Sequence, residues 1–277
     1  MPVDRLLVEG SLDAEVLGQV LSGNPPIENA SCSKDALCPK TRSERHRTDS
    51  NVCYLRDRDF DYEAPTDRSA PEVDQVDKQQ GNAVLGWHWC RHEMENYLLD
   101  PAIVTRVLPV AQGDYESALT AAASQIAAYQ ASRWAVGTAR RALPPHYELR
   151  TRPDEAGRHE FFLPNDMSET CSRAWAIDHT TAHRDRIGHC LSADSVSAVF
   201  AEKQAFFQEH VARSPAEALV WFSGKDLMLA LLSFWQTQGL DGPNAFRRKA
   251  RDWMYEHPED TMSAIPEWQI LVRILRT

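Results

Sequence analysis

The sequence predicts an α/β protein in which a mainly parallel central sheet is flanked by helices and is followed by a helical insertion and a helical C-terminal tail. Apolar runs at 6–8, 52–55 and 83–89 have the length of buried strands. A helical repeat of apolar residues follows the first run at 11–21, and an alanine-rich stretch covers 115–143. Strands that alternate with helical segments are typical of a parallel sheet.

The first strand and helix bring two carboxylates to one edge of the predicted sheet. Gly10 lets the chain turn from the strand at 6–8 into the helix at 11–21. Glu9 then stands at the carboxyl end of the strand, and Asp13 rises beside it from the first helical turn. Because ligands of open parallel sheets bind at this edge, both side chains are candidates for a binding site.

A second pair of carboxylates follows the strand at 52–55. Asp57 and Asp59 are two residues apart, and an extended backbone would point both side chains the same way. Two carboxylates in one small volume repel each other unless a cation neutralises them. The pair therefore predicts a site for Mg²⁺ or Mn²⁺, with helix capping as the alternative role for these acidic residues.

Turn and cap residues predict the elements up to position 108. The polar stretch 23–51 is expected to be irregular, with one short strand or helix. After the third strand at 83–89, Asp100 is a natural N-cap, and Pro101 takes the first helical position before a helix at 102–108.

The second half of the chain is predicted to be mostly helical. Helices are expected at 115–143 and 195–212, and the proline-bearing stretch 144–170 is expected to be a loop or a weak hairpin. The apolar run at 218–222 is predicted to return to the sheet as a core strand, followed by an amphipathic helix at 226–235.

No repeat or linker divides the chain, so a single domain spanning 1–277 is predicted. Its core combines 1–100 with 215–240, the helical insertion covers 101–214, and the helical tail covers 241–277. A chain of this length can bury a substantial core, and 43% hydrophobic with 25% charged residues is ordinary for a globular protein.

Four motifs together resemble one family. Val-Glu-Gly-x-x-Asp at 8–13 and Asp-x-Asp at 57–59 are similar to the Toprim domain of topoisomerases, primases and overcoming-lysogenization-defect (OLD) nucleases. The run that begins Trp-Cys-Arg-His-Glu at 89–101 resembles the stand-alone Toprim proteins encoded beside an ABC-type ATPase in bacterial anti-phage systems such as PARIS. Phe-Ser-Gly-Lys-Asp-Leu at 222–227 matches the place where OLD-type nucleases carry a lysine. The resemblance covers about half of the chain: 1–101 and 216–236.

The resemblance implies a Toprim-like fold and two metal ions, Mg²⁺ or Mn²⁺. It gives Glu9 the role of a metal ligand or of the general base that takes a proton from water. It implies that Asp13 binds a second ion directly or through water, and that Glu95, with Glu93, completes that second position. For the last two, the alternative is an interaction with a helix N-terminus. The implied metal ligands are Glu9, Asp13, Asp57, Asp59, Glu93 and Glu95.

Two basic residues are implied to act beside these carboxylates. Lys225 is placed to offset negative charge in the transition state, and its alternative is a surface lysine at the start of a helix. Arg91 either contacts a phosphate of the substrate or pairs with Glu95.

The implied activity is a metal-dependent endonuclease that hydrolyses phosphodiester bonds. The stand-alone relatives imply RNA, transfer RNA in particular, and the OLD relatives imply DNA. The implied biology is a toxic effector of anti-phage defence, active as a homodimer and restrained by an ABC-type ATPase. The chain has no Walker A pattern, so a nucleotide-driven step needs that partner. The alternative is a non-catalytic Toprim scaffold that docks the ATPase.

The formal net charge of −10 contrasts with the basic surface of most nucleic-acid-binding proteins. Several of the negative charges would be metal ligands, and basic residues cluster locally at 40–47, 140–141, 184–186 and 247–251. No run approaches the roughly 20 apolar residues of a membrane helix, and the N-terminus lacks the apolar stretch of a signal peptide. We therefore expect a cytoplasmic protein without a membrane partner.

One cysteine- and histidine-rich region leaves a zinc site open. Cys171, His179, His183, His189 and Cys190 fall within a short stretch, but their spacing follows no Cys-x-x-Cys pattern. Ordinary surface residues are the alternative, and the scattered cysteines are not expected to form a disulfide framework.

Overall fold

The computed structural model describes residues 2–48, 50–65, 67–142, 163–187 and 192–277. They form two compact units. The first, which we call the α/β unit, comprises Met1–Arg58, Ala64–Pro109 and Arg247–Thr277. The second, the helical unit, comprises Asp59–Glu63 and Val110–Phe246. Each unit is therefore assembled from segments that are far apart in the sequence.

The α/β unit is built on a five-stranded sheet in the order β2-β1-β3-β5-β4. All neighbouring strands are parallel except β4 and β5, which are antiparallel. The predicted fold class is thus confirmed, together with the three apolar strands and a short strand within 23–51. The strands are β1 Arg5–Val8, β2 Ile27–Asn29, β3 Val52–Arg56, β4 Glu72–Asp77 and β5 Ala83–His88.

Strand β4 was not predicted because it has no apolar run. Its sequence Glu-Val-Asp-Gln-Val-Asp places charged residues along the edge of the sheet, and Val73 is about half exposed. Charges on an edge strand discourage pairing with other chains, but they also remove the apolar pattern by which a strand is predicted. Asp74 anchors the edge strand by accepting a 2.5 Å hydrogen bond from the Tyr54 hydroxyl.

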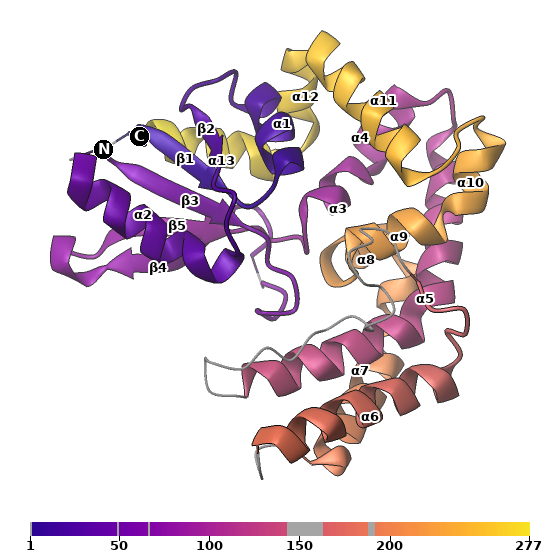
Figure 1. Cartoon of the computed structure of the whole chain (residues 1–277). Helices are drawn as coiled ribbons and strands as arrows, with labels where there is room; N and C mark the ends of the chain where they lie inside the picture. Colours follow the sequence, from indigo (N-terminus) through magenta and orange to yellow (C-terminus); the bar gives the residue numbers. More distant parts are fainter. Residues whose placement is uncertain (1, 49, 66, 143–162, 188–191) are drawn as a thin grey trace. The chain divides into compact units, whose positions relative to one another are not determined.

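Helices cover both faces of this sheet (Figure 1). Helix α2 lies over one face, where Leu37 joins Leu7, Tyr54 and Leu85 in an apolar core. Helix α13 covers the other face and brings the C-terminal segment against the first strand, since Val3 donates its N–H to the carbonyl of Leu275. The helices of this unit are α1 Ser11–Val20, α2 Lys34–Thr48, α3 Met94–Leu98, α4 Pro101–Val107, α12 Pro258–Ala264 and α13 Pro266–Arg276. The 3-10 helix η1 Lys78–Gln80 joins β4 to β5.

Helix α2 fills most of a stretch that was expected to be irregular. Its sequence is polar, but Leu37 and Arg45 are both buried against the sheet. The Arg45 guanidinium donates hydrogen bonds to the carbonyls of Val52, at 2.5 Å, and Val84, at 2.6 Å. Arg45 can be buried because two neighbouring strands accept its hydrogen bonds. It occupies part of the buried face of α2, so the sequence lacks the apolar pattern that would predict this helix.

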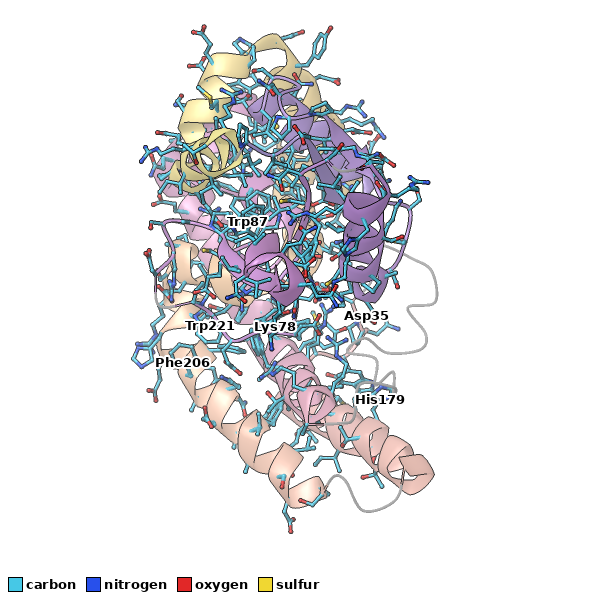
Figure 2. The ribbon with its side chains drawn as sticks, turned by 90° about the vertical axis from the view of Figure 1, so that its left-hand side faces the viewer. Asp35, Lys78, Trp87, His179, Phe206 and Trp221 are labelled. Atoms are coloured by element: carbon cyan, nitrogen blue, oxygen red, sulfur yellow. The ribbon has the colours of Figure 1, made fainter. Side chains whose placement is uncertain are left out.

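The helical unit is arranged around one long helix, α5, which packs against α6, α7, α8 and α9. Figure 2 shows Phe206 of α7 against Trp221 of α8, with ring centroids 5.1 Å apart. The predictions of helices at 115–143 and 195–212 are confirmed, and most of the stretch 144–170 lies outside the described residues. Its helices are α5 Gln112–Arg141, α6 Glu169–Ile187, α7 Ala193–Glu209, η3 Val211–Arg213, α8 Pro215–Trp221, α9 Gly224–Ala230 and α10 Leu232–Thr237. Helix α11, Pro243–Glu256, continues from the helical unit into the α/β unit.

The prediction of a returning core strand at 218–222 is wrong, because this run lies in helix α8 and its C-cap. Ser214 caps the helix by accepting a hydrogen bond from the N–H of Glu217, and Pro215 takes the first helical position. A short apolar run does not distinguish a buried helix from a buried strand. As a result, 215–240 belongs to the helical unit, and Arg247–Thr277 completes the α/β unit.

Within the residues that the structure describes, no helix combines the length and the apolar character needed to cross a bilayer.

Candidate functional site

The carboxyl ends of β1 and β3 bring Glu9 and Asp57 to the same edge of the sheet. The two strands are parallel neighbours, and Val8 is aligned with Leu55. Glu9 follows Val8 directly, and Asp57 lies two residues beyond Leu55. Because adjacent strands are about 4.8 Å apart, this register puts both acidic residues at one end of the strand pair. Both are partly buried, and the oxygens Glu9 Oε1 and Asp57 Oδ1 are shielded from solvent.

Asp13 is directed back toward the turn between β1 and α1. It lies in the first turn of α1 and is 8% exposed. A Cβ atom added to Gly10 would come within 2.9 Å of Asp13 Oδ2, so the carboxylate lies against the backbone next to Glu9. Gly10 has a φ of −122°, which any residue can adopt, so space rather than backbone freedom calls for glycine here.

The loop after β5 reaches the same edge of the sheet, but it uses Glu93 as a helix cap. Strand β5 pairs with β3, and the N–H of Trp89 donates to the carbonyl of Arg56 at 3.1 Å. Glu93 forms a reciprocal capping box with Asn96, whose side-chain oxygen accepts from the Glu93 N–H at 3.0 Å. This is the role that the sequence left as the alternative for Glu93.

Glu95 is 2% exposed in the first turn of α3. Its Oε1 lies 3.9 Å from Nη2 of Arg247, so α11 supplies a cation that faces this carboxylate.

Arg91 is held by its own loop and helix α3. Its guanidinium donates to Asp100 at 2.5 Å and to the Asn96 carbonyl at 3.0 Å, and it lies over the Tyr97 ring. The ion-pair partner that the structure records for Arg91 is thus Asp100, whereas the sequence suggested Glu95 or a phosphate. Asp100 also caps α4 as predicted, by accepting from the N–H of Ala102.

A buried carboxylate that was not predicted, Glu267 on α13, organises the start of this loop. It accepts hydrogen bonds from the Cys90 N–H at 2.9 Å and from the Tyr97 hydroxyl at 2.5 Å. Burial raises the pKa of Glu267, and these two hydrogen bonds oppose that shift. Burial and the nearby Glu267 carboxylate raise the pKa of Tyr97 well above its ordinary value. The sequence signal for this residue is an acidic side chain in the first turn of an amphipathic helix.

Asp59 lies in the helical unit, and its backbone has a positive φ of 48°. Strand β3 ends at Arg56, so the extended backbone assumed for the Asp57 and Asp59 pair does not continue to Asp59. The segment that follows is fixed to α5: Arg140 pairs with Asp61, and Arg141 donates to Glu63 at 2.5 Å. The basic pair Arg140-Arg141 is thus neutralised by acidic residues of the same unit.

Lys225 lies in the first turn of helix α9, in the helical unit, and is partly buried. Ser223 caps that helix, and its hydroxyl accepts from the Asp226 N–H at 3.5 Å. The lysine thus lies at the start of a helix, although the run before it is helix α8 rather than the predicted strand.

Oxygen donors around the β1–α1 turn are compatible with a hard cation. Among the described residues, however, no group of three or more His, Cys, Asp or Glu side chains is close enough to hold a metal ion. Mg²⁺ is commonly held by only one or two carboxylates, together with water and substrate phosphate. Glu9 and Asp57 are a pair of this size at one edge of the sheet.

Among the described residues of the cysteine- and histidine-rich region, no group of three or more His, Cys, Asp or Glu side chains could hold a zinc ion. Cys171 is exposed and its Sγ lies 2.9 Å from Asp166, while His179 stacks on Trp175. His189 and Cys190 lie outside the described residues.

Neither the models of protein families nor the curated protein sequences that were compared with this chain give a match.

Proposed function

We propose that the chain is a divalent-metal-dependent endonuclease of the Toprim type. The observation that supports this best is the pair of parallel neighbours β1 and β3, which deliver Glu9 and Asp57 to one sheet edge in the order that the family motifs require. The close approach of Asp13 to Gly10 adds a third carboxylate to the same turn.

Glu9 and Asp57 would hold Mg²⁺ or Mn²⁺, and Asp13 would bind a second ion directly or through water. When bound, such an ion lowers the pKa of a coordinated water and stabilises charge on the oxygens of a phosphodiester. Glu9 serves either as a ligand or as the base that accepts the proton of the attacking water. The partial burial of Glu9 and Asp57 keeps bulk water from screening these charges.

The remaining residues divide into two groups. Glu93 and Arg91 shape the loop after β5 through their contacts with Asn96 and Asp100. We therefore keep the proposed metal role for Glu95, in the first turn of the helix that follows this loop. Asp59 and Lys225 keep the roles that the resemblance gives them, as a metal ligand and as a cation that offsets charge in the transition state.

The proposed substrate is nucleic acid, either transfer RNA or DNA, and the proposed setting is anti-phage defence. The resemblance at 89–101 supports an effector that is restrained by an ABC-type ATPase and is active as a homodimer. A cytoplasmic location follows from the same proposal.

Purified protein incubated with total transfer RNA and with plasmid DNA tests the activity. We expect Mg²⁺- or Mn²⁺-dependent cleavage of one substrate, inhibition by a chelator, and a loss of at least about 100-fold in Glu9→Gln and in Asp57→Asn. Glu15→Gln is the matched control, because it removes the same charge from an exposed position of α1 that pairs with Arg251.

Two results would contradict the proposal. Equal cleavage by the wild type and Glu9→Gln would assign the activity to another site or protein. Cleavage of neither substrate, with or without the ATPase, combined with stable binding to that ATPase, would establish the non-catalytic scaffold instead.

A further inference from the structure

We propose that Arg133, on helix α5, is a positioning residue that holds the segment after Asp59 and the start of helix α9 in one fixed arrangement. The inference rests on the proposed function, which gives Asp59 and Lys225 roles in cleavage. All of the contacts that carry it lie within the helical unit.

Arg133 first fixes the helix that carries Lys225. Its guanidinium forms an ion pair with Asp226, the residue after Lys225, and the two side chains are 7% and 1% exposed. Gln130, one turn earlier on α5, donates to Asp226 Oδ2 at 2.7 Å and accepts from the Ser223 N–H at 3.0 Å. Residues on both sides of Gly224 and Lys225 are therefore bonded to one turn of α5.

The same arginine also contacts the residue after Asp59. Its guanidinium carbon lies 4.4 Å from the centre of the Phe60 ring, which is 1% exposed. One turn later, a Cβ atom added to Gly137 would come within 2.6 Å of Phe60 Cβ and 3.1 Å of the Phe60 carbonyl oxygen. The Phe60 backbone thus lies directly on α5, where Gly137 has no side chain.

The chemistry of the guanidinium explains why one residue can make both contacts. Its edge donates to a carboxylate while its planar face lies over an aromatic ring, and a lysine ammonium offers neither geometry. A buried ion pair adds little to stability compared with an apolar pair of similar volume, so stability alone does not account for Arg133 and Asp226. A fixed geometry does account for them. Arg133 holds Phe60 and Asp226 in one arrangement, and these two residues directly follow the proposed site residues Asp59 and Lys225.

The double variant Arg133→Met/Asp226→Leu tests the inference because it removes both buried charges together. Arg133→Met alone would leave the Asp226 carboxylate buried without its cation. A lower cleavage rate in that variant would not distinguish a misfolded protein from one with misplaced site residues. For the double variant we expect one cooperative thermal unfolding transition, with a midpoint lowered only by the hydrogen bond that the buried Gln130 amide loses. We expect the maximal cleavage rate to fall about 100-fold while the half-saturating substrate concentration stays unchanged. Arg133→Lys should also lose rate, because it keeps the charge but not the planar face.

Ser132→Ala is the matched control. Ser132 is equally buried on α5, but its hydroxyl donates to the Tyr129 carbonyl of the same helix. This variant should cleave at the wild-type rate. A double variant that cleaves at the wild-type rate would overturn the positioning role.

Hydrogen exchange gives a measurement that does not depend on cleavage. In the double variant, amides of 60–63 and of 224–227 should both exchange faster than in the wild type, and amides near the centre of α7 should not change. Unchanged exchange in either segment would overturn the coupling. If the wild type cleaves no nucleic acid, the proposed function fails, and the exchange measurement alone then decides whether Arg133 couples the two segments.

Discussion

The sequence predicts the positions of individual residues at the sheet edge where the backbone is regular. Glu9 and Asp57 were predicted at a common edge because both follow apolar runs, and parallel neighbouring strands end on the same side. Asp59 was assigned the same direction as Asp57 by assuming an extended chain, and its positive φ breaks that assumption. No pattern in the local sequence marks such a conformation at an aspartate, although aspartate tolerates it better than most residues do.

Partners of charged residues were the least predictable feature. Arg91 pairs with Asp100 because the loop after β5 folds back on α3, and this depends on Glu267, which is 170 positions away from Tyr97 in the chain. Spacing along the sequence predicts pairs within one helix, but it does not predict contacts that the tertiary fold creates.

Gly86 gives a prediction about stability at the scale of one residue. A Cβ atom added to Gly86 would lie 2.5 Å from ring atoms of Tyr54, which is fully buried on the neighbouring strand. Because the added methyl group would overlap with this buried ring, Gly86→Ala should lower the free energy of unfolding by about 1–3 kcal/mol. Chemical denaturation measures this change.

The control for that prediction is Gly18→Ala in helix α1. A Cβ atom there meets nothing within 4 Å, and alanine is the better helix former. This variant should be more stable by about 0.5–1 kcal/mol. If Gly86→Ala were as stable as the wild type, the close packing of β3 and β5 at Tyr54 would be contradicted.

At the scale of elements, the sequence predicts those whose apolar residues form a pattern. Strands β1, β3 and β5 and helices α1, α4, α5 and α7 all carry such patterns and were found. Helix α2 was underestimated because Arg45 replaces an apolar contact, β4 was missed because it is an edge strand, and α8 was mistaken for a strand. In each case tertiary burial, rather than local propensity, decides the structure.

The attachment of α13 to the loop after β5 predicts a pH dependence. The pKa of Glu267 is raised in the folded protein, so the folded state binds more protons than the unfolded state above the ordinary glutamate pKa. The stability that the protonated carboxyl contributes is present below that ordinary value and is lost as the pH rises through the raised value. Glu267→Gln removes this loss, because its amide does not ionise.

Unfolding of the wild type and of Glu267→Gln at a series of pH values checks the sign. The wild type minus variant difference in unfolding free energy should decrease as the pH rises from below about 4.3, the ordinary glutamate pKa, and should then level off. A difference that increases with pH would show that the hydrogen bonds from Tyr97 and Cys90 outweigh burial.

At the scale of the whole molecule, the α/β unit depends on both ends of the described chain. Ile265, Trp268, Leu271 and Leu275 are all at most 1% exposed. Each such side chain contributes about 1.5–3 kcal/mol when it is buried. Four together therefore contribute an amount comparable to the whole stability of a typical domain, which is about 5–15 kcal/mol. A chain that ends at Ala264 should therefore lose the cooperative unfolding of the α/β unit.

Near-ultraviolet circular dichroism during thermal unfolding measures that loss. Arg273→Ala, on the exposed side of α13, should leave the transition unchanged. A truncated chain with a wild-type transition would mean that the sheet is stable without its last helix.

The hydrogen bond from Val3 to Leu275 also has a consequence for biosynthesis. Strand β1 is synthesised before the helical unit and α13 is synthesised after it, so the N-terminal segment has one apolar face exposed while the helical unit is made. Domains commonly fold in the order of their synthesis. Here the carboxylate edge would mature only once α13 has been synthesised, and until then its strands would depend on the ribosome or on chaperones for protection from aggregation.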